Sequence, residues 1–147
     1  MISILQRVSS ASVIVDGKTI GQIGRGLLIL MCAERGDDEK IAEKMVDKIL
    51  KLRIFSDDHG KMNLSAHDTQ AGILIVSQFT LAADCTGGNR PSFGLAATPQ
   101  EGNRLYDHFL HYARIQHPSV ESGQFGANMQ VHLVNDGPVT IPLRMNA

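Results

Sequence analysis

The stretch Gly72-Ile-Leu-Ile-Val76, followed directly by Ser77-Gln-Phe-Thr-Leu81, decides the fold. An apolar run without polar alternation is typical of a strand that is covered on both faces. Leu27-Leu-Ile-Leu-Met-Cys32 is a second run of this kind. We therefore expect a sheet with two buried strands, and hydrogen-bonding side chains placed directly after one of them.

Alternating and turn-forming residues predict further strands at both ends of the chain. Residues 2–8 alternate with strand periodicity. Asp16-Gly17 is flanked by strand-like residues and is a favoured two-residue hairpin turn, because both positions tolerate positive φ. Near the C-terminus, residues 129–133 and 139–143 alternate as two separate strands.

Two helices are predicted between the strands. Acidic residues 37–39 suit the first turn of a helix that extends to about Leu52, because negative charge there complements the helix dipole. Thr98 and Glu101 have the spacing of a capping box, so the second helix begins there and ends before Pro118. The order of elements predicts an α/β domain with a mixed sheet, barrel-like β layers and two main helices packed on one side.

Size and composition exclude several classes of protein. The 147 residues, taken as a single domain spanning 1–147, have 43% hydrophobic and 20% charged side chains, as in an ordinary soluble globule. A net charge of -1 gives no general attraction to nucleic acid, so any RNA contact must come from a local patch. We expect no signal peptide and no membrane span. Cys32 and Cys85 match no metal or redox spacing, which favours a reducing cytoplasm.

Three polar groupings each have a chemical and a plain interpretation. His108 and His111 lie three residues apart on a helix and could share a metal, but no further ligands are evident, and a polar helix face is favoured. Cys85 beside Asp84 could be a thiol nucleophile, although no cysteine signature surrounds it. Gly87-Gly-Asn-Arg90 could hold a phosphate through backbone amides and one guanidinium, or form a plain flexible loop.

Two motifs are more informative than these groupings. Ser77–Leu81 places hydroxyl and amide groups directly after a buried strand, and Asn135-Asp-Gly-Pro-Val-Thr140 places a glycine–proline step between two predicted strands. An X-Pro bond is cis in only about 5–6% of cases, so a trans turn is the default, yet a plain hairpin needs no proline. Neither motif carries an obvious acid, base or metal ligand. The combination indicates a site that works through shape and backbone dipoles.

In their joint order and spacing, these and other motifs resemble the D-aminoacyl-tRNA deacylase family over essentially the whole chain. The motifs are Gln6-Arg-Val-Ser9, Arg53-Ile-Phe-Ser-Asp57, Gly60-Lys-Met-Asn63, Ser77–Leu81, Arg90-Pro-Ser-Phe93, the spaced Phe125, Ala127 and Met129, and Asn135–Thr140. The resemblance implies a cytoplasmic homodimer that removes D-amino acids from the acceptor end of tRNA. It implies no cofactor, no metal, and neither a membrane nor a DNA partner.

The resemblance also implies how such an enzyme would select its substrate. A cis Gly137–Pro138 step would enter the partner subunit's site, where its carbonyls would accept hydrogen bonds from the α-ammonium group of the substrate. An L side chain would collide with this backbone, whereas glycine, which has no side chain, would be accepted. Arg7 would brace the step. Phe125 and Met129 would form the wall for the terminal adenosine.

For hydrolysis, the resemblance implies that the terminal ribose 2′-hydroxyl of the tRNA assists. Ser77, Gln78, Phe79 and Thr80 are the catalytic candidates: the N–H groups of Phe79 and Thr80 would stabilise the oxyanion, and Ser77 and Gln78 would hold the substrate. A nucleophilic Thr80 is the alternative, without a visible activating partner. Two other classes stay open. One is a small-ester hydrolase with Cys85 or Ser77 as nucleophile, and the other is a non-catalytic nucleic-acid- or partner-binding module.

Overall fold

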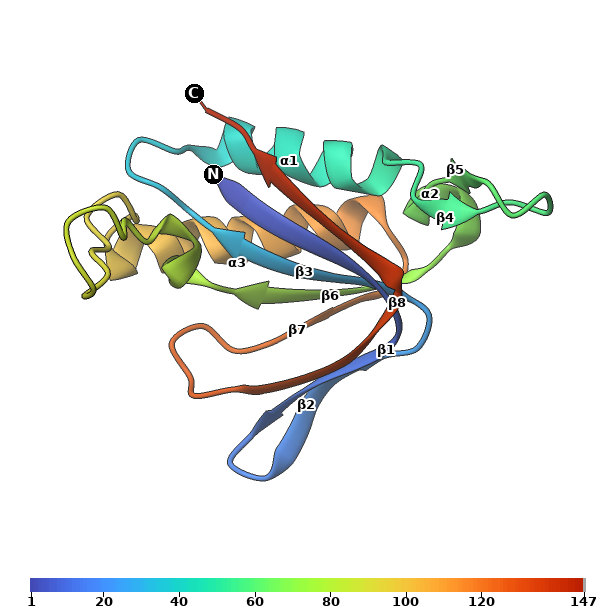
Figure 1. Cartoon of the computed structure of the whole chain (residues 1–147), viewed down its shortest axis with the longest axis horizontal. Coiled ribbons are helices and arrows are strands. Elements are labelled where there is room, and N and C mark those ends of the chain that lie inside the picture. Colours follow the sequence, from blue (N-terminus) through green and yellow to red (C-terminus); the bar gives the residue numbers. More distant parts are fainter. Residues whose placement is uncertain (147) are drawn as a thin grey trace.

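A strongly curved sheet of six strands forms the centre of the computed structural model, which describes residues 1–146 (Figure 1). Its order is β2-β1-β3-β6-β7, and β8 pairs with β1. The β3–β6 and β6–β7 pairs are parallel and the others are antiparallel, so the predicted mixed sheet is confirmed. The strands are β1 (Ile2–Val15), β2 (Lys18–Ile23), β3 (Gly26–Cys32), β6 (Gly72–Ser77), β7 (Val120–Ser122) and β8 (Gln130–Arg144).

The sheet curls until its two ends nearly meet, which gives the predicted barrel-like form. A Cβ atom at Gly21 of β2 would lie 2.6 Å from the carbonyl oxygen of Ser122 in β7, so only glycine allows the strands to approach this closely. The hairpin between β1 and β2 turns at Asp16-Gly17, where both residues have the positive φ that the sequence predicts.

Two long helices, α1 (Glu39–Lys51) and α3 (Pro99–Gln116), cover one face of the sheet, as predicted (Figure 1). The Asp38 carboxylate accepts the Ile41 N–H at 3.0 Å and caps α1, and Thr98 caps α3 in the same way. The shorter elements are β4 (Phe55–Ser56), β5 (Met62–Leu64), α2 (Ala66–Thr69) and the 3₁₀ turn η1 (Phe79–Ala82). None of the helices described has the length and apolarity needed to span a bilayer.

Apolar side chains alternate between two cores because successive strand residues point to opposite faces. One core lies between the sheet and the two long helices and includes Leu27, Ile29, Ile73 and Ile75. The other lies inside the curl of the sheet and includes Val8, Val13, Leu28, Leu74 and Val76. β3 and β6 therefore contribute to both cores, which explains their continuous apolar sequences.

The C-terminal strands predicted at residues 129–133 and 139–143 are a single strand, β8, so that prediction was wrong in detail. Ser10 of β1 pairs with Val134 and Gln6 pairs with Thr140, so the ladder is present on both sides of the glycine–proline step. Residues 136–139 pair with no residue of β1 and form a bulge. The Gly137–Pro138 bond in this bulge is cis. The bulge interrupts the alternation, which is why the sequence reads as two strands.

Candidate active site

A pocket of about 590 Å³ opens where β3 and β6 end. Parallel strands end at the same edge of a sheet, and open α/β sheets commonly bind ligands there. The volume lies within the range of small-molecule sites. The lining residues are Met31, Cys32, Ala33, Val76, Ser77, Gln78, Phe79, Phe93, Ala96, Ala97, Thr98, Pro99, Gly102, Phe125, Gly126, Ala127, Asn128, Met129 and Val131.

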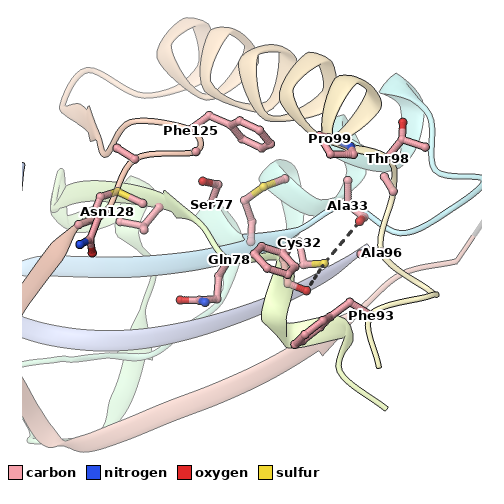
Figure 2. A pocket seen from close by; sticks show the side chains of 18 of the residues that line it. Cys32, Ala33, Ser77, Gln78, Phe93, Ala96, Thr98, Pro99, Phe125 and Asn128 are labelled. Atoms are coloured by element: carbon pink, nitrogen blue, oxygen red, sulfur yellow. Dashed lines mark hydrogen bonds between the residues drawn. The ribbon is translucent and has the colours of Figure 1, made fainter. Parts of the chain in front are cut away.

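Five of the nine predicted site residues line this pocket: Ser77, Gln78, Phe79, Phe125 and Met129. Figure 2 shows Ser77 and Gln78 between Phe125 on one side and Phe93 on the other. Thr80 lies just outside the lining, and its exposed hydroxyl accepts a hydrogen bond from the Gln78 side-chain amide. The segment predicted to be catalytic and the wall predicted for adenosine therefore meet, although they come from distant parts of the chain.

The lining contains no Asp, Glu, His, Lys or Arg side chain among residues 1–146. Its only ionisable group is the thiol of Cys32, which is 2% exposed. Burial, together with the negative charge of Glu34, raises the pKa of this thiol to about 11, so it is protonated at neutral pH. The protein thus offers no side chain here that could act as a general base near pH 7.

Backbone groups supply the polar chemistry of the pocket instead. The N–H of Gln78 donates to the Met31 carbonyl oxygen at 2.7 Å, which ties the start of η1 to the end of β3. The next two N–H groups, those of Phe79 and Thr80, donate no hydrogen bond within the part of the chain that the structure describes. Unpaired N–H groups are the donors that an oxyanion site requires.

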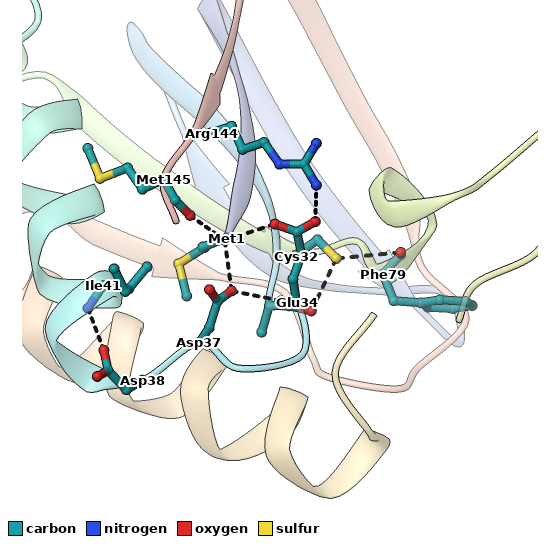
Figure 3. A network of polar contacts seen from close by, with 10 residues as sticks. Met1, Cys32, Glu34, Asp37, Asp38, Ile41, Phe79, Arg144 and Met145 are labelled. Carbon is teal, nitrogen blue, oxygen red and sulfur yellow. Dashed lines mark hydrogen bonds and ion pairs between the residues drawn. The ribbon is translucent and has the colours of Figure 1, made fainter. Parts of the chain in front are cut away.

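A network of ion pairs and hydrogen bonds surrounds the residues that follow β3, next to the pocket (Figure 3). The buried ammonium group of Met1 binds the carboxylates of Glu34 at 3.0 Å and Asp37 at 2.8 Å, and Arg144 also pairs with Glu34. The Cys32 thiol donates to the Phe79 carbonyl oxygen at 3.5 Å. The ion pairs hold the N-terminus and Arg144 against the residues that follow β3. The Cys32–Phe79 hydrogen bond joins the end of β3 to η1, the two backbone segments that frame the pocket.

The remaining predicted residues, Gly137, Pro138 and Arg7, lie away from the pocket. Arg7 donates to the Ile54 carbonyl oxygen at 2.9 Å and to the Asp136 carbonyl oxygen at 3.2 Å. It therefore braces the start of the bulge, while Gly137 and Pro138 have no register partner in β1.

The strand register gives the distance between the bulge and the pocket along β1. Arg7 pairs with Leu27 and Ser3 pairs with Met31, which in turn pairs with Ser77. The bulge and the pocket are thus about four residues apart along β1, or roughly 13 Å at about 3.3 Å per residue. The two motifs of one chain do not form a common site.

Comparison with known proteins assigns this chain to a family. The family model described as D-Tyr-tRNA(Tyr) deacylase matches residues 4–144. The chain belongs to this family. A protein of Variovorax paradoxus named D-aminoacyl-tRNA deacylase is 65% identical over 145 residues, which is 99% of each chain. A protein of the same name from Aromatoleum aromaticum is 62% identical and covers 99% of this chain and 95% of its own.

Two solved structures share the fold of this deacylase family member. A structure titled c-Myc DNA Unwinding Element Binding Protein has a TM-score of 0.94 at 45% identity, with complete coverage of both chains. A structure titled as an analysis of a probable eukaryotic D-amino acid tRNA deacylase has a TM-score of 0.83 at 20% identity over 97% of each chain, and this likeness concerns the fold alone. Membership of the deacylase family makes the chain a hydrolase whose substrate class is aminoacyl-tRNA.

The structure of this deacylase also bears on the other groupings in the sequence. Nε2 of His108 lies 3.0 Å from a Glu43 oxygen across α1 and α3, as expected for a polar helix face. No group of three or more His, Cys, Asp or Glu side chains within residues 1–146 is placed to hold a metal. Cys85 is exposed and lies outside the lining of the pocket.

Sequence reasoning missed several lining residues, notably Cys32, Ala96, Thr98 and Gly102. Cys32 had a usable signal, because the ends of two apolar strands meet when those strands pair in parallel. Ala96 and Gly102 carry no chemical signal, since their contribution is the space that a small side chain leaves.

Proposed function

We propose that this chain is a homodimeric enzyme that hydrolyses the ester bond of D-aminoacyl-tRNAs and of glycyl-tRNA, with help from the terminal 2′-hydroxyl of the tRNA. One observation carries the mechanism: the unpaired N–H groups of Phe79 and Thr80 lie in or next to the pocket, and among residues 1–146 no side chain that lines it can act as a base. A 2′-hydroxyl supplied by the substrate itself would hydrogen-bond the attacking water and relay its proton to the leaving 3′-oxygen, so no side-chain base is required.

In this mechanism the terminal adenosine lies against Phe125 and Met129, which are half-buried in the pocket wall. The N–H groups of Phe79 and Thr80 stabilise the negative charge that develops on the ester oxygen. Ser77 and Gln78 hold the end of the substrate. Because backbone amides are fixed before the substrate arrives, they stabilise the transition state without reorganisation.

A second subunit supplies the filter against L-aminoacyl esters. Gly137 and Pro138 are exposed and have no register partner in β1, so their carbonyls suit an ammonium group. Their roughly 13 Å separation from the pocket along β1 of the same chain supports insertion into a partner. With the ammonium bound there, an L side chain meets backbone and a D side chain does not. A preference of about 10⁴-fold requires only about 5.5 kcal/mol, which a steric collision can supply.

The test uses D-tyrosyl-, L-tyrosyl- and glycyl-tRNA with the purified protein, together with its mass in solution by light scattering. We expect a dimer that rapidly cleaves the D and glycyl esters and spares the L ester. The D ester whose terminal ribose lacks the 2′-hydroxyl should react at least 100-fold more slowly. Fast cleavage of that 2′-deoxy ester would exclude assistance by the substrate, and a monomer with full selectivity would exclude the filter from a partner.

A second candidate function is binding of nucleic acid without catalysis. The observation that favours it is the 45% identity to the c-Myc DNA Unwinding Element Binding Protein. In that case single-stranded DNA would bind tightly and all three aminoacyl-tRNA esters would survive. A Ser77-dependent esterase is less well supported, because no base lines the pocket beside that hydroxyl in the described residues.

A further inference from the structure

Two aromatic rings at the edge of the pocket are unusually exposed. Phe79 is 59% exposed and Phe93 is 37% exposed, and their ring centroids lie 5.1 Å apart at an interplanar angle of 72°. Both side chains line the pocket, and Phe93 lies on the side opposite Phe125 (Figure 2). Phe125 packs near Tyr106, with the ring centroids 5.9 Å apart, so it belongs to the inner wall, whereas Phe93 belongs to the rim.

Backbone hydrogen bonds brace the segment that carries Phe93. The N–H and C=O of Ser92 pair with those of Asp84 at 2.9 Å and 2.7 Å, and this pair closes the loop that contains Arg90. The Ala96 N–H then donates to the Phe93 carbonyl oxygen at 3.1 Å. Exposed aromatic surface is thus presented by a braced segment, which is how a stacking surface would be built.

We propose that Phe93 is the stacking platform for the base of the nucleotide that precedes the terminal adenosine, and that Arg90 pairs with the phosphate between these two nucleotides. This inference rests on the proposed function, in which Phe125 and Met129 hold the adenosine. A tRNA ends in single-stranded CCA, so a chain that leaves the pocket must pass over its rim. Single-stranded RNA is commonly bound by stacking of its bases on aromatic side chains.

The charge on the rim favours a nucleotide over an apolar partner. Arg90 is exposed and forms no ion pair within residues 1–146, so its guanidinium is available to a phosphate. The nearest acidic residue in the loop, Asp84, already accepts hydrogen bonds from the N–H and hydroxyl of Thr86. A phosphate held by Arg90 would correspond to the phosphate-binding interpretation of residues 87–90 rather than to a plain loop.

The test compares two minimal substrates, D-tyrosyl-adenosine and D-tyrosyl-cytidylyl-adenosine, which differ by the proposed base and phosphate. The wild-type enzyme should prefer the longer substrate by about tenfold or more in kcat/KM, since stacking one base corresponds to about 5- to 100-fold in affinity. Phe93→Ala should remove most of that preference and Phe93→Tyr should retain it. Arg90→Ala should reduce the preference and lower the salt dependence of log KM by about 0.7.

Leu95→Ala is the matched control, because Leu95 is 57% exposed in the same loop but lines a separate hollow with Glu34 and Arg144. It should keep the preference. Equal losses on both substrates in Phe93→Ala would assign Phe93 to the pocket wall and overturn the inference. Wild-type enzyme with a longer substrate that is abasic at the cytidine position tests stacking without a mutation, and an undiminished rate would also overturn it. If the wild-type enzyme cleaves neither substrate but cleaves D-tyrosyl-tRNA, the inference alone fails; if it cleaves none, the proposed function fails with it.

Discussion

Replacing Thr80 by alanine separates a backbone mechanism from a nucleophilic one. The Thr80 hydroxyl is exposed, and its one hydrogen bond within residues 1–146 comes from the Gln78 side chain. Losing such a bond costs about 0.5–1.5 kcal/mol, and alanine keeps the N–H that the proposed oxyanion site uses. Since about 1.4 kcal/mol corresponds to tenfold, we expect kcat/KM to fall by about tenfold at most. Loss of a covalent nucleophile would instead cost about 10⁴-fold or more.

The assay is single-turnover release of D-tyrosine from D-tyrosyl-tRNA, with enzyme in excess so that chemistry rather than product release is measured. Thr19→Ala is the control, because Thr19 is an exposed threonine of β2 that lies outside the pocket. It reports the effect of losing a threonine side chain in general. A Thr80→Ala rate at the uncatalysed level, with an unchanged melting temperature, would refute the backbone mechanism and restore Thr80 as the nucleophile.

Three further changes test other parts of the structure. Cys32→Ala should keep kcat within about threefold. With a pKa of about 11, only a fraction on the order of 10⁻³ or less of the thiol is ionised at pH 7.5, so it cannot serve as a base or nucleophile. Inactivation of a folded variant would contradict this. Gly137→Ala should lower the free energy of unfolding in urea by about 1–3 kcal/mol, because φ is +128° and its Cβ would lie 2.9 Å from Val139 Cγ2; an unchanged midpoint would show that the bulge relaxes. Hydrogen bonds from the N–H groups of Lys61 and His59 lower the pKa of Asp57, so the stability this carboxylate contributes is present above pH of about 4 and is lost as the pH falls through its folded pKa. The difference in melting temperature between wild type and Asp57→Asn should therefore shrink in acid, and a constant difference would exclude this origin.

The sequence predicts the parts of the fold whose signal is local. The cap at Asp38 and the hairpin at Asp16-Gly17 depend on residues within one turn of each other, and both are present in the structure. The apolar run before Ser77 requires burial on both faces, which β6 has. These features follow from hydrogen bonding and periodicity that a short window of sequence contains.

Features that depend on distant contacts were not predictable in this way. β4 and β7 have two and three residues, too few for an alternating pattern to be recognised. The pocket joins the end of β6 to Phe125 and Thr98, which the chain brings together only after folding. The family resemblance placed Phe125 and Ser77 in one site because it reflects the folded structures of relatives. Residue patterns along a single sequence do not contain that information.

The bulge in β8 also limits how this protein can change in length. Between the Ser10–Val134 and Gln6–Thr140 pairs, β1 advances by four residues and β8 by six. Before the bulge, Val131 and Leu133 pack against the core inside the curl, and after it Ile141 and Leu143 pack against the core beside the helices, so the register of each part decides which core its side chains enter. Removing a single residue would turn the last part of the strand over and expose its apolar side chains. Insertion or deletion of two residues at the glycine–proline step should therefore be tolerated, whereas insertion or deletion of one residue should detach the C-terminal end of the chain from the sheet.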